Sequence, residues 1–306
     1  MLQERDTMKI AIFGAGGVGG YIGARLLRAG GHEVTLVARG KHLQAIQAEG
    51  LRVQDEEERY VVHPDHAVRS LEGLGVYDLI ILAVKSYDLE EALERISAHS
   101  NSDTVLLPLL NGVDHDLEVL ARFPDAQVLN GCIYIFSNIT TPGAIKKYGG
   151  VFHLFYGSRD EPKEYYREIE KLFNATGLKH RLTDKIELET WRKYLLISAF
   201  ASLSSYYAVP LGIIAQDHYA ELAQLLAEIK AVANAKGIML EDKNVKNVLD
   251  QVKSIPFGSK TSMQLDFEAG KPTELEALTG YIVKKGQRVG LKTPIMKRIY
   301  QKLTEA

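Results

Sequence analysis

The sequence has a single cysteine and no long apolar run. With only Cys132, the chain can form no internal disulfide and offers no cysteine cluster for zinc, so no metal site is expected. The polar N-terminus is followed by the apolar segment IAIF, which stops at a glycine and is too short for a signal-peptide core. No run approaches the length of a membrane span. These absences predict a protein of a reducing cytoplasm that does not enter the membrane.

An excess of charge of either sign is also missing. The 37 basic and 39 acidic side chains give a formal net charge of −2, which offers no broad attraction for nucleic acid or for an anionic membrane. The composition, 46% apolar and 25% charged, is typical of a folded globular protein, and a length of 306 residues favours two domains. Partners must therefore be inferred from local sites.

The first part of the chain alternates between two kinds of pattern. From Lys9 to about Thr183, short β-rich runs alternate with helical patterns, which predicts a parallel sheet with crossover helices. The clearest strands are expected at 9–13, 33–38, 78–84, 104–110 and 131–136, with helices near 17–29, 41–49, 88–97 and 114–122. After Gly131 the alternation becomes less regular, and the sequence predicts hairpin-like strands, a helix at 162–175 and a last strand, LKHRL.

The second part of the chain loses the strand pattern. After Asp184, apolar residues recur at three- and four-residue spacing, which predicts helices. We therefore expect an α/β domain over residues 1–184 and an all-helical domain over residues 185–306. The apolar helices suit a subunit interface as well as an internal core, so the oligomeric state stays open and a homodimer is one arrangement they allow.

The segment GAGGVGG, residues 14–20, directly follows the first strand and opens a helical pattern. In this context the glycines predict a dinucleotide site: Gly14 would permit the tight turn, Gly16 the approach of a pyrophosphate, and Gly19 close packing of the helix. The phosphates would bind at the helix N-terminus. The expected cofactor-binding residues of this turn are Gly14, Ala15, Gly16, Gly17, Val18 and Gly19.

The end of the second strand predicts which dinucleotide binds. NAD enzymes usually carry an acidic residue there for the ribose hydroxyls, whereas the segment TLVARGKH offers Arg39 and Lys41 and no carboxylate. A 2′-phosphate would suit these cations, so NADP or NADPH is expected. Lys85, at the end of the strand 78–84, lies at the same edge of the sheet and could add a cation. Solvated surface charge is the alternative interpretation of each of these residues.

Asn111, in the segment LLNGV, follows another buried strand and is expected at the same edge of the sheet. Its amide could donate to a ligand oxygen and accept from a hydroxyl, although Asn-Gly is also an ordinary turn pair.

Several motifs together are similar to those of one family. In their order and approximate spacing they resemble the ketopantoate reductase (2-dehydropantoate 2-reductase) family over nearly the whole chain. The motifs are IAIFGAGGVGG, Arg39, AVKSY, LLNGV, PGAI, WRKYLL and SMQLDFEAGKPTELE. The resemblance implies NADPH-dependent reduction of ketopantoate to pantoate, a step of pantothenate biosynthesis. It also implies that residues 1–184 form a Rossmann-type domain that binds the cofactor. Residues 185–306 would form an all-α domain, like that of 6-phosphogluconate dehydrogenase, that carries substrate binding and catalysis.

The resemblance also implies roles for single residues. Lys193 corresponds to the general acid of the family, and Asn111 to an amide that contacts both cofactor and substrate. Ser262 matches a substrate-binding hydroxyl, and Glu274 a carboxylate beside the nicotinamide ribose and the catalytic lysine. Ser137 falls where the family has a backbone contact to the cofactor.

Lys193 suits this role chemically. Hydride transfer to a ketone leaves developing alkoxide charge, which an ammonium group can stabilise and then protonate. The apolar neighbours in the segment YLLI would disfavour the charged form of Lys193, whereas a nearby Glu274 would favour it. The alternative is a lysine whose stem merely covers apolar side chains.

Three positions depart from the family pattern. Biosynthetic members carry asparagine at three positions: four residues after the catalytic lysine, eight residues after it, and just before a later glycine. This chain has Ile197, Ala201 and Leu211 at these positions. Loss of such polar contacts can change specificity strongly. A more apolar 2-oxo acid is therefore an alternative substrate. A relative of 6-phosphogluconate or 3-hydroxyisobutyrate dehydrogenase and a non-catalytic NADPH sensor are two further alternatives.

Overall fold

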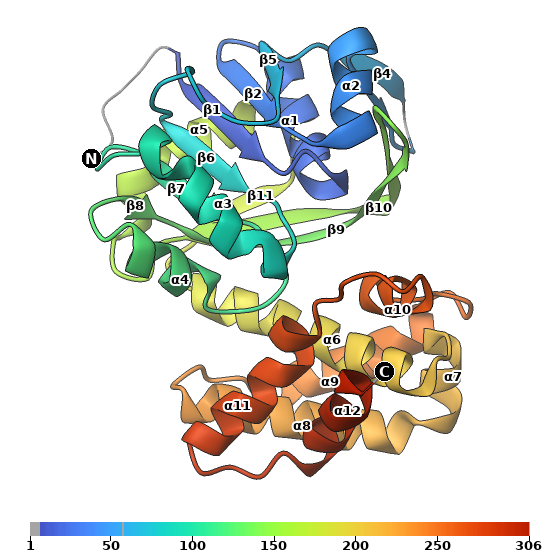
Figure 1. Cartoon of the computed structure of the whole chain (residues 1–306). Coiled ribbons are helices and arrows are strands. Elements are labelled where there is room, and N and C mark those ends of the chain that lie inside the picture. Colours follow the sequence, from blue (N-terminus) through green and yellow to red (C-terminus); the bar gives the residue numbers. More distant parts are fainter. Residues whose placement is uncertain (1–6, 57, 306) are drawn as a thin grey trace. The chain divides into compact units, whose positions relative to one another are not determined.

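The computed structural model describes residues 7–56 and 58–305 (Figure 1). The chain divides into two compact units. Unit 1 runs through Leu110 and resumes over Asp114–Ile186, whereas unit 2 combines Asn111–Val113 with the chain from Glu187 onward. Asn111, which the sequence placed at the end of a strand, is thus grouped with the helical residues.

Unit 1 contains a parallel sheet with the strand order β5-β2-β1-β6-β7-β8. Its strands are β1 (Lys9–Phe13), β2 (Glu33–Val37), β5 (His66–Val68), β6 (Leu79–Leu82), β7 (Val105–Pro108) and β8 (Gln127–Val128). From β1 the chain builds one half of the sheet outward through β2 to β5. It then returns to β6, on the other side of β1, so the strand order reverses between β1 and β6. In such a sheet, ligands bind at the carboxyl ends of the strands near this reversal.

Helices cover both faces of this sheet (Figure 1). Alternate side chains of β1 point to opposite faces: Ile10 and Ile12 pack in one apolar cluster with α1, and Ala11 and Phe13 pack in another with α3. The helices of unit 1 are α1 (Gly17–Ala29), α2 (Gly40–Glu49), α3 (Leu89–Ile96), α4 (His115–Arg122) and α5 (Arg167–Ala175), with 3₁₀ turns η1 (Ser86–Asp88), η2 (Ser97–His99) and η3 (Lys163–Tyr166). The expected Rossmann-type fold is confirmed.

A second sheet accompanies the first in unit 1, with the order β11-β10-β3-β4 and with β9 paired to β10. Its strands are β3 (Leu51–Gln54), β4 (Arg59–Val62), β9 (Asn130–Thr141), β10 (Ala144–Gly157) and β11 (His180–Leu182). The hairpin expected after Gly131 is confirmed as the antiparallel pair β9 and β10. The helix expected at 162–175 is partly wrong, because α5 begins at Arg167 and the preceding turn is 3₁₀.

Unit 2 is helical. Its helices are α6 (Ile186–Tyr207), α7 (Leu211–Asp217), α8 (Tyr219–Ala235), α9 (Asp242–Ser254), α10 (Ser262–Glu268), α11 (Tyr281–Arg288) and α12 (Pro294–Thr304), and the segment η4 (Glu276–Gly280) is a π-helix. Helix α6 is buried around most of its circumference, with Trp191, Tyr194, Leu195 and Phe200 in the core of the unit. Burial on nearly every face explains why α6 reads as an almost unbroken apolar run.

Within the described residues, no single helix is both long and apolar enough to cross a membrane. The pair Ile186–Tyr207 and Leu211–Asp217 passes this test together, on length and composition alone, and is bent by 88°.

Candidate active site

The glycine-rich turn joins β1 to α1 at the carboxyl edge of the parallel sheet. Gly14 has a φ of +102°, which favours glycine, and a Cβ atom there would lie 2.7 Å from the carbonyl oxygen of Ala83. A Cβ at Gly19 would lie 2.3 Å from the carbonyl oxygen of Gly14, whereas no atom lies within 4 Å of a Cβ built at Gly16. Gly14 and Gly19 thus permit close packing, and Gly16 faces open space.

This turn has the geometry that a pyrophosphate requires. The N–H groups of Gly14 and Ala15 donate to the carbonyl oxygen of Val37, at 3.2 and 2.9 Å, and hold the turn against the end of β2. The N-terminus of α1 follows at Gly17, with its first N–H groups and the positive end of its dipole. Because the backbone at Gly16 is uncovered, the residues present fit a dinucleotide phosphate.

Ser137, on β9, packs directly on this turn. A Cβ at Gly17 would lie 2.4 Å from the Ser137 carbonyl oxygen, so glycine is required for the approach of β9. The Ser137 hydroxyl is buried and has no hydrogen-bond partner within the described part of the chain. Ser137, which the family resemblance indicated, therefore contacts the glycine-rich turn with its backbone.

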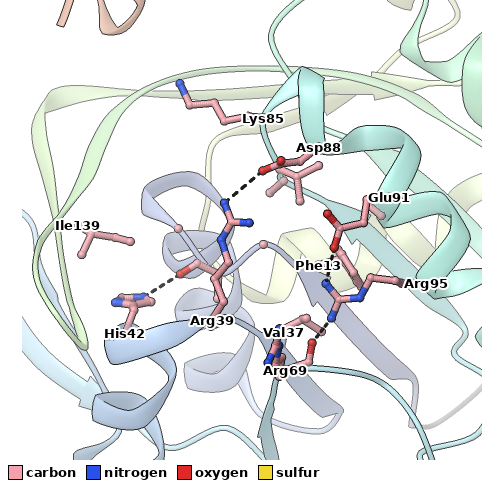
Figure 2. Close-up of a pocket in the computed structure, with 17 residues that line it drawn as sticks. Phe13, Val37, Arg39, His42, Arg69, Lys85, Asp88, Glu91, Arg95 and Ile139 are labelled. Carbon is pink, nitrogen blue, oxygen red and sulfur yellow. Dashed lines mark hydrogen bonds and ion pairs between the residues drawn. The ribbon is translucent and has the colours of Figure 1, made fainter. Parts of the chain in front are cut away.

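A pocket of about 330 Å³ extends from the glycine-rich turn over the ends of β2, β5 and β6 (Figure 2). Arg39 and Lys85, both expected from the sequence, line it. Its basic side chains are Arg39, His42, Arg69, Lys85 and Arg95, and its acidic side chains are Asp88 and Glu91. The Arg39 side chain is 80% exposed and its Nη2 lies 3.3 Å from Asp88 Oδ2. Cations outnumber carboxylates, which suits a phosphorylated ribose.

His42 is a pocket residue that the sequence gave no reason to single out. Its Nδ1 accepts a hydrogen bond from the N–H of Gly143 at 3.0 Å, so Nε2 carries the proton and donates to the Ala15 carbonyl oxygen at 2.9 Å. This neutral imidazole ties the glycine-rich turn to the β9–β10 turn. Gly143 is 101 positions away, so only the folded chain reveals the link.

Substitution of His42 by glutamine is expected to reduce the pH dependence of stability. Burial lowers the pKa of His42 from its usual 6.5, so the native state favours the neutral ring. The neutral His42 ring contributes fully to the free energy of unfolding above pH 6.5. This contribution is lost as the pH falls through the lowered native pKa, because the unfolded state binds the proton first.

Urea unfolding from pH 5 to 8 would measure this effect, with His63→Gln on an exposed histidine as the matched control. Burial also lowers the pKa values of His32 and His180, but these residues contribute equally to wild type and variant. Parallel stability curves for His42→Gln and wild type would contradict the prediction.

Three of the site residues expected from the sequence meet in unit 2. The ammonium of Lys193, on α6, donates to Asn111 Oδ1 at 2.9 Å, and Asn111 Nδ2 donates to Glu274 Oε2 at 3.3 Å. Lys193 is 6% exposed and Glu274 is 2% exposed. The amide of Asn111 thus bridges a buried cation and a buried carboxylate, and both ends of the amide are fixed by charged partners. This arrangement is unlike a surface lysine that covers apolar side chains.

The π-helical segment η4 fixes Glu274 relative to α6. Tyr194 donates to the carbonyl oxygen of Leu278 at 2.8 Å, Ser198 donates to the same oxygen at 2.6 Å, and Ser202 Oγ lies 2.8 Å from Thr279 Oγ1. These three side chains recur every four residues on one face of α6. A π-helical turn changes the backbone hydrogen bonding of a helix and often occurs at functional sites. The hydroxyls of Ser198 and Ser202 therefore bind this segment.

Ser262 and the three apolar replacements also lie in unit 2. Ser262 is exposed at the first position of α10, after Thr261, whose hydroxyl is 2.9 Å from Ser204 Oγ on α6. Ile197 is half-buried, whereas Ala201 and Leu211 are 3% and 5% exposed and pack in the apolar core of the unit. The helical period places Ile197 and Ala201 close to the face of Lys193, so apolar side chains share this face of α6 with the lysine.

The fold and these clusters define a class. A Rossmann-type sheet with a glycine-rich turn and a basic pocket, followed by a helical unit with a buried lysine, is the construction of a two-domain NADP-dependent oxidoreductase. Family models agree: the model of ketopantoate reductase PanE/ApbA matches residues 10–160, and that of its C-terminal part matches residues 185–306. The chain belongs to the ketopantoate reductase family, whose members are NADP-dependent and reduce a 2-oxo acid. The dehydrogenases related to 6-phosphogluconate dehydrogenase are thereby set aside.

Three proteins show what this chain is similar to. The uncharacterized oxidoreductase YkpB of Bacillus subtilis (strain 168) is 31% identical over 97% of this chain and 98% of its own length. The structure of 2-dehydropantoate 2-reductase from Porphyromonas gingivalis W83 has a TM-score of 0.86 and 31% identity over 97% of this chain and 99% of that one. The structure of D-mandelate dehydrogenase with NADH and anilino(oxo)acetate has a TM-score of 0.86 and 26% identity, with 96% of each chain covered.

Proposed function

We propose that this chain reduces ketopantoate to pantoate with NADPH and that Lys193 is the general acid. The observation that carries the proposal is the buried hydrogen-bonded series in which Asn111 links the Lys193 ammonium, at 2.9 Å, to the Glu274 carboxylate, at 3.3 Å. A buried charge pair with no catalytic task costs desolvation and is often no better for stability than an apolar pair. A catalytic role for the Lys193 ammonium would account for this costly burial of charge.

In this proposal the two units have separate tasks. Unit 1 holds the cofactor, with the glycine-rich turn and Ser137 at the pyrophosphate and with Arg39 and Lys85 at the phosphorylated ribose. When bound, NADPH supplies the hydride that goes to the 2-oxo carbon. Unit 2 contributes Lys193, Asn111, Ser262 and Glu274.

The residues of unit 2 handle the charge that hydride transfer creates. The Lys193 ammonium would stabilise the developing alkoxide and then transfer a proton from Nζ to that oxygen. Asn111 Oδ1 orients the ammonium, and the same amide donates to the Glu274 carboxylate. Ser262, exposed at the start of α10, would donate its hydroxyl to the substrate.

The direct test is oxidation of NADPH by the purified protein with ketopantoate, followed by the absorbance of the cofactor, beside a panel of simple 2-oxo acids. We expect turnover with ketopantoate. Turnover only with other members of the panel would contradict ketopantoate as the substrate but keep the reaction class. Binding of NADPH without turnover of any 2-oxo acid would favour a cofactor sensor instead.

A more apolar 2-oxo acid is the second candidate substrate. It is favoured by Ile197, Ala201 and Leu211, which offer methyl groups where biosynthetic members of the family carry amides. The similarity to D-mandelate dehydrogenase supports the same candidate, because the name of that protein denotes an aromatic 2-hydroxy acid. Such a substrate would be bound through its carboxylate and its oxo oxygen, with its side chain against α6.

Replacement of both Ile197 and Ala201 by asparagine is expected to raise kcat/KM for ketopantoate by about tenfold, since each amide could add a hydrogen bond to the substrate. Activity with apolar 2-oxo acids should fall in the same variant. Steady-state kinetics with ketopantoate and with benzoylformate would measure both changes. An isosteric control, Ile197→Leu, should leave the ratio of the two activities unchanged. No gain with ketopantoate in a correctly folded double variant would contradict the prediction.

A further inference from the structure

Arg69 follows β5 and lies at the same edge of the parallel sheet as Arg39. Strand β5 pairs in parallel with β2 so that Val68 is opposite Val37, and the N–H of Ala38 donates to the Val68 carbonyl oxygen at 3.0 Å. Neighbouring strands lie about 5 Å apart. Both arginines therefore leave the sheet at adjacent positions, and both line the same pocket (Figure 2).

The two carboxylates of this pocket are paired with other arginines. Asp88 pairs with Arg39 at 3.3 Å, and Glu91 pairs with Arg95 at 3.5 Å. Among the residues that the structure describes, the Arg69 guanidinium has no carboxylate within 4 Å. The pocket thus has a guanidinium whose charge is not neutralised locally.

The backbone of Arg69 is fixed although its side chain is exposed. The Arg95 guanidinium donates to the Arg69 carbonyl oxygen and lies over the ring of Phe13, 5.1 Å from its centroid. Figure 2 shows the Arg95 side chain between Glu91 and this carbonyl. Arg95 therefore acts as a support that positions the residue next to it, while the charge of Arg69 faces solvent and pocket.

We propose that Arg69 is a further phosphate-binding residue, which contacts the 2′-phosphate of NADPH together with Arg39, and that Asp88 is the carboxylate that this phosphate displaces from Arg39. A phosphate monoester has three acceptor oxygens and close to two negative charges, more than one planar guanidinium can satisfy. The exposed pair of Arg39 and Asp88 contributes little to stability, so its exchange is easy. The inference rests on the proposed function only through the cofactor, and it assigns the selectivity for NADPH over NADH to these residues.

The test is a binding titration of the full chain with NADPH and with NADH, followed by cofactor fluorescence and without any 2-oxo acid. Arg69→Gln is expected to weaken NADPH binding by about tenfold, the effect of losing one hydrogen bond from a charged donor, and to change NADH binding less than about twofold. The control Arg59→Gln removes the same charge from an exposed position on β4, outside the pocket, and should change neither affinity.

A second variant tests the carboxylate. Asp88→Asn removes a like charge from the phosphate site and releases Arg39, so NADPH should bind about threefold tighter while NADH is unchanged. The proposal is wrong if Arg69→Gln weakens both cofactors equally or neither, or if Asp88→Asn does not tighten NADPH. Because no substrate is present, these outcomes are separate from the proposed function: a wild-type protein that binds NADPH but reduces no 2-oxo acid contradicts only the latter.

Discussion

Lys193→Met is expected to lower kcat/KM for the preferred 2-oxo acid by about 10³- to 10⁴-fold, the combined scale of general acid catalysis and alkoxide stabilisation. Methionine keeps most of the volume of the side chain, so the site beside α6 should stay packed, and the buried Glu274 carboxylate loses a nearby cation. The dissociation constant of NADPH should change little, because the phosphate-binding residues lie in unit 1. Steady-state kinetics and a cofactor titration would separate the two effects.

Two controls make this result specific to the ammonium. Lys246→Ala removes a lysine from an exposed position of α9 and should leave kcat/KM unchanged. The thermal unfolding of Lys193→Met should be that of a folded protein. A variant that lost activity by unfolding would also lose NADPH binding, so retained binding excludes this explanation. A folded Lys193→Met variant with more than about a tenth of the wild-type kcat/KM would rule out Lys193 as the general acid.

Gly16→Val is expected to weaken NADPH binding by at least about 100-fold without a change in Tm. The backbone at Gly16 has a φ of −79°, which any residue can adopt, and nothing lies within 4 Å of a Cβ built there. The Cβ of the valine therefore meets no other atom of the protein, and the side chain occupies the space in which a pyrophosphate would approach the backbone. Isothermal titration with NADPH and a thermal melt of the same sample would measure both quantities.

Gly19→Ala is the matched variant with the opposite expectation. The new Cβ would lie 2.3 Å from the Gly14 carbonyl oxygen, a backbone atom that cannot move aside cheaply, so overpacking should cost about 1–3 kcal/mol and lower Tm by several degrees. Cofactor binding should weaken as a consequence of the displaced turn. A lowered Tm for Gly16→Val together with an unchanged Tm for Gly19→Ala would overturn this division of roles.

Much of unit 1 could be predicted because its signals are local. The runs that became β1, β2, β6 and β7 are short and apolar, and the glycine-rich segment follows the first of them directly. The short strands β3, β4, β5 and β8 were not predicted. Two of them, β3 and β4, owe their place to a second sheet in which β3 pairs with β10, about 90 positions away, and no window of sequence shows such a pairing.

The candidate site divides in the same way. The sequence indicated Lys193, Asn111 and Glu274, through family motifs, but not that the amide of Asn111 would bridge the other two. It also gave no sign of the π-helical segment η4, since a change from α to π hydrogen bonding depends on partners such as Tyr194 on another helix.

The sequence by itself determined the α/β and all-helical halves, the dinucleotide turn, the preference for a phosphorylated cofactor, and the family with its 2-oxo acid chemistry. These follow from periodicity, from glycine spacing and from motifs in a fixed order, all of which are written along the chain. Only the tertiary structure decided that His42 joins two turns, that Arg69 lines the same pocket as Arg39, and which serines contact η4. Those relations depend on strand register and on helix packing between residues far apart in sequence, where the chain carries no local signal.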